Sequence, residues 1–130
     1  MTYSAVFKEH LAHPHNAGEL PGATVVVEET NPVCGDRLRL YLLVEDDQIE
    51  TAKYLAYGCP PTLVCGSVLT DLVRGKKIQE ALAITKDVLI AAAGGLPGRK
   101  HHSAALALET LRSALTQLGT STEEKSLNLT

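Results

Sequence analysis

Residues 37–57 read RLRLYLLVEDDQIETAKYLAY. Apolar residues occupy every second position over the first nine, and such alternation predicts a strand with one buried face. The acidic pair Asp46-Asp47 is a turn signal, after which Ile49 to Tyr57 supplies a second strand. The stretch therefore predicts an antiparallel hairpin. The residues expected on its buried face include Leu38, Leu40, Leu42 and Val44.

The chain on both sides of this hairpin completes an α+β pattern. Thr24 to Thr30, which contains three consecutive valines, predicts a further strand. Beyond the hairpin, apolar residues recur at helical spacing. We expect a small three-stranded antiparallel sheet with helices packed on one face. The predicted helices are Tyr3–Leu11, Thr62–Arg74, Ile78–Ala83, Lys86–Ala93 and a last one that contains Ala104–Leu118.

The size and composition of the chain indicate one domain. It has 130 residues, of which 45% are hydrophobic and 21% charged. We predict a single domain over residues 1–119 and a polar, disordered tail over residues 120–130. With 4 Tyr, 1 Phe, no Trp and a net charge of -3, the sequence argues against a nucleic-acid partner.

The N-terminal residues and the cysteine content favour a cytoplasmic protein. Residues 1–10 contain polar and charged side chains where a signal peptide needs an apolar core, and no run is long enough for a membrane helix. The 3 cysteines are too few, and odd in number, for a disulfide framework. We therefore expect free thiols or metal ligands, and no contact with a membrane.

Residues that bind metals stand at three predicted junctions. Cys34 and Asp36 flank Gly35 before the hairpin, Cys59 lies between its second strand and a helix, and the pair His101-His102 precedes the last helix. Two thiolates, an imidazole and a carboxylate can complete the tetrahedral shell of zinc or hold a small iron-sulfur cluster. A helix N-terminus also stabilises a thiolate at Cys59.

Other histidines and cysteines have simpler interpretations. Cys65 lies among apolar residues of a predicted helix, so we interpret it as a core residue rather than as the partner of Cys59. His10, His13 and His15 could form a second metal patch, but a solvated loop is the preferred interpretation.

The chain resembles the IscU/NifU N-terminal family of iron-sulfur cluster assembly scaffolds from about Tyr3 to Leu118. Five segments in the same order carry this resemblance, and in the last one a histidine stands where the family has its third cysteine. The segments are Tyr3-Ser4 through His10 and His13-Pro14-His15-Asn16-Ala17-Gly18; Asn31-Pro32-Val33-Cys34-Gly35-Asp36; Tyr57-Gly58-Cys59; Gly75-Lys76; and Leu96-Pro97 through Arg99 with His101-His102-Ser103.

The resemblance implies a ligand set of Cys34, Asp36 and Cys59. We infer from chemistry that His102 replaces the third cysteine, with His101 as the substitute ligand, because imidazole can replace thiolate at zinc or iron. The implied cofactor is a [2Fe-2S] cluster or iron, with zinc in the isolated protein. No catalytic residues are predicted, and we expect a non-enzymatic scaffold or carrier.

The resemblance also implies partners. They are a cysteine desulfurase and acceptor apoproteins, and we expect a monomer or weak dimer. The stretch from Leu96 to Lys100 is shorter than in the family, which argues against binding of an Hsp70-type chaperone there.

Two alternative functions remain open. One is a zinc-dependent sulfur acceptor resembling the SufU branch, although that branch carries an insertion before its last ligand, for which residues 94–102 are too short. The other is a metal-free binding module that uses the same loops for partner contact.

Overall fold

The computed structural model describes residues 3–129, with side chains described from residue 3 to residue 118. Within this part of the chain, three strands are followed by a run of helices, as the sequence predicts. The elements are α1 (Ala5–Ala12), β1 (Val25–Thr30), β2 (Arg37–Glu45), β3 (Gln48–Tyr57), α2 (Pro60–Val73), α3 (Ile78–Leu82), α4 (Lys86–Ala92), the 3-10 turn η1 (Gly98–Lys100) and α5 (His101–Leu129).

The described strands form one antiparallel sheet in the order β1-β2-β3. β2 and β3 pair from Arg37 with Tyr57 to Glu45 with Gln48, so the predicted hairpin is confirmed. Asp46 and Asp47 both have positive φ angles, of 51° and 62°. A two-residue hairpin turn whose twist matches that of the flanking strands requires positive φ at both central residues.

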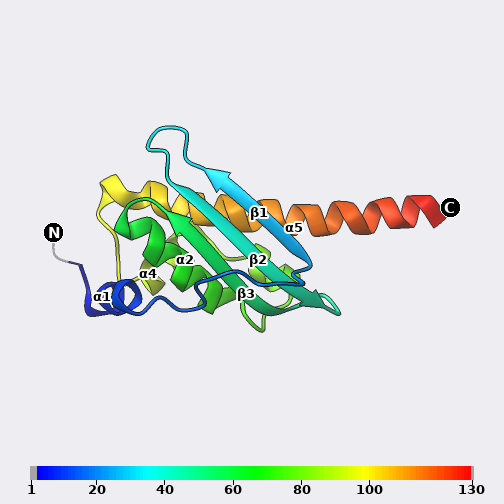
Figure 1. Cartoon of the computed structure of the whole chain (residues 1–130), viewed down its shortest axis with the longest axis horizontal. Coiled ribbons are helices and arrows are strands. Elements are labelled where there is room, and N and C mark those ends of the chain that lie inside the picture. Colours follow the sequence, from blue (N-terminus) through cyan, green and yellow to red (C-terminus); the bar gives the residue numbers. More distant parts are fainter. Residues whose placement is uncertain (1–2, 130) are drawn as a thin grey trace.

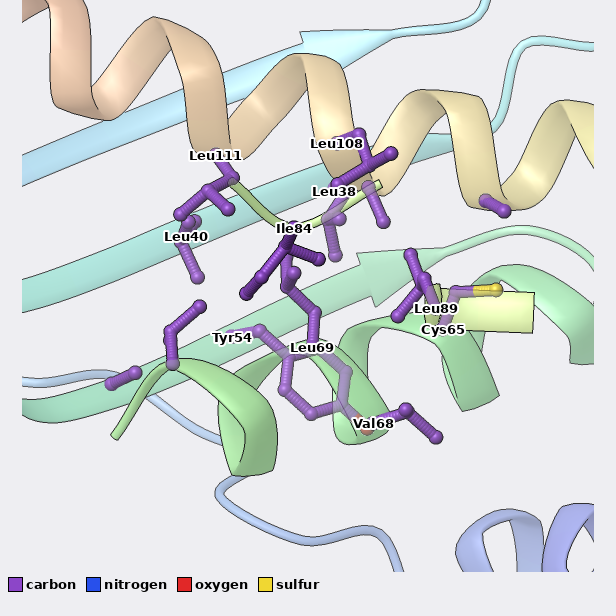
Figure 2. Close-up of a cluster of buried hydrophobic side chains, with 14 of the residues drawn as sticks. Leu38, Leu40, Tyr54, Cys65, Val68, Leu69, Ile84, Leu89, Leu108 and Leu111 are labelled. Atoms are coloured by element: carbon purple, nitrogen blue, oxygen red, sulfur yellow. The ribbon is translucent and has the colours of Figure 1, made fainter. Parts of the chain in front are cut away.

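The helices lie on one face of this sheet, which confirms the predicted α+β class (Figure 1). α2 packs against β3, while α5 crosses β1 and β2. Figure 2 shows Leu40 and Tyr54 of the sheet pointing toward Leu69 of α2 and Leu111 of α5. Tyr54 lies directly on Gly66, where a Cβ atom would collide with its ring. Most of the buried side chains around this contact are aliphatic, as the low aromatic content predicts.

α5 is the element whose limits differ most from the prediction. It begins at His101, directly after η1, and its backbone continues to Leu129. The sequence predicts a disordered tail over residues 120–130. The side chains of residues 119–130 lie outside the described residues, so the tail stays a prediction. Along residues 3–129, no helix combines the length and apolarity needed to cross a membrane.

Candidate metal centre

The loop between β1 and β2 presents Cys34 at one end of the sheet. Asn31 closes this loop, because its side-chain oxygen accepts hydrogen bonds from the backbone N–H groups of Val33 (2.9 Å) and Cys34 (3.2 Å). The backbone of Asn31 also pairs with that of Asp36, at 2.8 Å. Gly35 has a φ of 79°, a conformation that favours glycine. The closed loop leaves the Cys34 side chain exposed.

Asp36 is the most buried of the predicted ligands, at 7% exposure. Its Oδ2 accepts hydrogen bonds from the Thr62 hydroxyl (2.7 Å), the Cys59 thiol (3.0 Å) and the Cys59 backbone N–H (3.3 Å). Burial alone would raise the pKa of Asp36, but the hydrogen bonds from Cys59, Thr62 and Cys34 outweigh it and lower the pKa below its usual value. The carboxylate is therefore held ionised in a dry position.

Cys59 lies between β3 and α2, as the sequence predicts, and occupies the N-cap position of α2, which begins at Pro60 rather than at Thr62. Its backbone is extended, and Pro60 and Pro61 form the first helical positions. The chain reaches this cap through Gly58, which has a φ of 150° and lies so close to Asp36 that a Cβ atom would collide with the carboxylate. The Cys59 thiol thus points at Asp36 from the N-terminus of α2.

Two buried hydroxyl groups connect this site to α5. The Thr62 hydroxyl lies 3.1 Å from Ser103 Oγ, and the Cys59 sulfur lies 3.6 Å from Thr62 Oγ1 and 3.7 Å from Ser103 Oγ. Both Thr62 and Ser103 are at most 1% exposed. Nothing in the sequence distinguishes these two residues, because many proteins have a threonine in a first helical turn or a serine after a histidine.

His101 and His102 both lie in the first turn of α5, but their rings have different neighbours. His102 belongs with Cys34 and Asp36 to a group whose possible ligand atoms all lie within 4.8 Å of one another. Its Nδ1 is 3.1 Å from the Arg99 carbonyl oxygen, which leaves the other ring nitrogen for a metal. His101 Nε2 is instead 3.1 Å from the Leu96 carbonyl oxygen.

Cys59 stands next to this group of three rather than within it. Among the described residues, the group contains Cys34, Asp36 and His102, while the Cys59 sulfur is joined to it through the hydrogen bond to Asp36. Loss of the thiol proton on metal binding would break that hydrogen bond and free both side chains. The convergence of all four ligands on one ion or cluster stays a prediction.

The surroundings of the group leave room for a small bound species. Asn31, Val33, Cys34 and His102 line a hollow of about 220 Å³. A larger hollow of about 410 Å³ lies beside the β2–β3 turn, but its lining of Asp46, Asp47, Lys77, Ile78 and Gln79 holds no thiol or imidazole. We therefore assign the smaller hollow to the site.

Cys65 is separated from this chemistry, as the sequence predicts. It is 0% exposed and lies among core side chains of α2 and α4 (Figure 2). Burial, with a smaller contribution from Cys59, raises the pKa of its thiol to about 12. A thiol in this state is a poor nucleophile and a poor ligand.

These features define a small α+β domain with thiol, carboxylate and imidazole groups gathered at one end of its sheet. The chain matches the NifU-like N-terminal domain family over residues 2–125 and belongs to that family.

Relatives and solved structures agree with this assignment. The chain is 40% identical over 113 residues to the iron-sulfur cluster assembly scaffold protein IscU 1 of Archaeoglobus fulgidus. This match covers 87% of this chain and 74% of that protein. It is 37% identical over 84 residues to the zinc-dependent sulfurtransferase SufU of Bacillus subtilis, covering 65% and 56%. A crystal structure from Fervidobacterium islandicum, described as an iron-sulfur cluster assembly scaffold protein for the SUF system, superposes with a TM-score of 0.74 at 25% identity; the match covers 87% of this chain and 96% of that chain.

Proposed function

We propose that this protein is an iron-sulfur cluster assembly scaffold that binds a [2Fe-2S] cluster transiently and transfers it to acceptor proteins. The observation that carries the proposal is that the possible ligand atoms of Cys34, Asp36 and His102 lie within 4.8 Å of one another. The Cys59 thiol is hydrogen-bonded to Asp36 in this group. The 40% identity to an IscU scaffold supports it. The low number of cysteines is consistent with a cytoplasmic protein.

Each ligand has a distinct role in this proposal. Cys34 and Cys59 supply thiolates, and His102 supplies a ring nitrogen in place of a third thiolate. Asp36 supplies a hard oxygen donor to a cluster whose irons prefer sulfur, so it is the ligand most easily exchanged. Thr62, which also contacts Ser103, holds the carboxylate when the cluster has left, and this keeps the empty site ordered. Iron or zinc can occupy the same donors.

The histidine restricts how sulfur reaches the site. Nitrogen cannot carry transferable sulfur, so a persulfide delivered by a cysteine desulfurase must form on Cys34 or Cys59. Cys34 is exposed and Cys59 half-buried, whereas Cys65 is enclosed by the core. We therefore infer that a desulfurase docks over the loop that carries Cys34.

Cluster transfer to an apo-ferredoxin tests the scaffold function. The loaded protein should convert apo-ferredoxin to its holo form, and Asp36→Cys should hold the cluster longer and slow the transfer, because a thiolate is a better iron ligand than a carboxylate. A loaded wild-type protein that transfers no cluster would contradict the scaffold function. Equal transfer rates for the two proteins would contradict the role of Asp36.

A second candidate function is zinc-dependent sulfur transfer, which the similarity to the SufU of Bacillus subtilis favours. Here Cys34 or Cys59 would leave the zinc to accept sulfur. The connection between α4 and α5 is short and contains the η1 turn, Gly98–Lys100. It has no room for the insertion expected in that branch. Incubation with a desulfurase and cysteine, followed by mass spectrometry, distinguishes the two functions. Catalytic turnover of persulfide to a thiol acceptor would favour sulfur transfer.

A further inference from the structure

A second cluster of metal-binding side chains lies away from the first, on the outer side of α2. It contains His10 from the last turn of α1, His15 from the loop that follows, and Asp71 from α2. Their possible ligand atoms all lie within 4.8 Å of one another. We propose that His10, His15 and Asp71 bind a divalent transition-metal ion.

The geometry brings both imidazoles to the same carboxylate. His15 Nδ1 is 2.5 Å from Asp71 Oδ2, and the ring centroids of His10 and His15 are 4.3 Å apart. Glu9 adds a further carboxylate, with Oε1 3.6 Å from His15 Nε2. Two imidazoles and one or two carboxylates are a donor set typical of Zn²⁺ and Fe²⁺, and with three protein ligands a position stays open for water.

Neighbouring polar groups hold these ligands in place. Ser67, which is 0% exposed, lies 2.7 Å from His10 Nδ1 and accepts a hydrogen bond from the His15 backbone N–H at 2.8 Å. This contact occupies one nitrogen of His10 and leaves Nε2 for the ion. A ligand histidine whose second nitrogen is bonded to a fixed partner is the usual arrangement at protein metal sites.

Hydrogen bonds also hold the Asp71 carboxylate, through its Oδ1 atom. Asn16 Nδ2 donates to Asp71 Oδ1 at 2.8 Å, and the Arg74 guanidinium donates to Asn16 Oδ1 at 2.9 Å. These hydrogen bonds orient Asp71 Oδ2 toward His15. Asp71 and Glu9 place two carboxylates beside the imidazoles of His10 and His15, and a divalent cation would balance their charge.

The site is accessible and separate from the cluster site. The side chains of His15 and Asp71 are 38% and 40% exposed, so an ion can enter without unfolding. Asp71 lies nine residues beyond Thr62 in α2, which places it roughly 14 Å along the helix axis at about 1.5 Å per residue. A bound ion would join α1 and its following loop to α2 and stabilise the N-terminal part of the fold.

Zinc titration of a protein without the thiolates of the first site tests the proposal. In the double variant Cys34→Ser/Cys59→Ser, competition with a chromophoric chelator should show one tightly bound Zn²⁺, and Zn²⁺ should raise the melting temperature. Adding His15→Gln or Asp71→Asn should abolish this binding. His13→Gln changes an exposed histidine of the same loop and should leave it intact.

A graded variant separates a metal site from a simple ion-pair network. Ser67→Ala removes the partner of His10 and should weaken zinc binding by about tenfold. No zinc bound by the double variant, or equal binding by the His13→Gln and His15→Gln proteins, would overturn the proposal. Since the first site is already disabled, neither result depends on cluster assembly.

Discussion

Replacing Thr62 by valine tests the hydrogen bonds that organise the empty cluster site. Thr62 is 1% exposed and donates to Asp36 Oδ2 at 2.7 Å. A hydrogen bond to a charged group contributes about 1.5–3 kcal/mol, and valine keeps the size of the side chain. We expect the free energy of unfolding of the metal-free protein to fall by about 2 kcal/mol. For a slope of about 1–3 kcal/mol per M urea, the midpoint should shift down by roughly 1 M.

Thr110→Val is the matched control, measured in the same urea titrations. Thr110 is likewise buried, at 0% exposure, but its hydroxyl donates to the backbone carbonyl of Leu106 within α5, at 2.8 Å. This neutral bond should contribute about 1 kcal/mol or less. If Thr62→Val lowers the midpoint no more than Thr110→Val does, the Asp36 carboxylate is not held as the structure indicates.

Two further predictions concern the thiols and the histidine ligand. Iodoacetamide at pH 8 should label Cys34 first and Cys59 next, and Cys65 only after unfolding, because a pKa of about 12 leaves about one thiolate in ten thousand; rapid labelling of Cys65 in the folded protein would contradict its burial. In the loaded protein, His102→Cys should lower the reduction potential and weaken cluster loss on acidification, since protons compete with metal for the ring nitrogen. His101→Ala should leave both properties unchanged, and an effect equal to that of His102→Cys would reassign the ligand.

The sequence predicts the sheet well because its signals are local. The alternation that buries Leu38, Leu40 and Leu42 and the turn at Asp46-Asp47 depend on neighbouring residues, and both match the structure. Val44 is only half-buried, because the register of β2 and β3 shifts between Leu43 and Val44. The start of α5 was predicted less well. The apolar stripe begins at Ala104, whereas η1 leads the chain into the helix at His101, which apolar periodicity does not reveal.

The candidate site was predictable in composition and not in connectivity. Junction positions make Cys34, Asp36, Cys59 and the pair His101-His102 candidates, and the family resemblance favours His102 within the pair. The hydrogen bond from Cys59 to Asp36 depends instead on how α2 meets the sheet. The second cluster shows the same limit. The sequence suggests a solvated loop around His10, His13 and His15. It does not reveal the contact with Asp71, because Asp71 is 56 residues from His15. The structure instead brings His10 and His15 to Asp71 and Ser67, and of these three described histidines it leaves His13 exposed.

Anaerobic reconstitution with ferrous iron and sulfide tests most directly whether Cys34, Asp36, Cys59 and His102 hold one cluster. The wild-type protein should bind iron and sulfide in equal amounts and show visible charge-transfer bands. These bands should be lost in Cys34→Ser and in Cys59→Ser and retained in Cys65→Ala. A wild-type protein without visible bands, or bands that survive the loss of Cys34 and Cys59, would contradict the account.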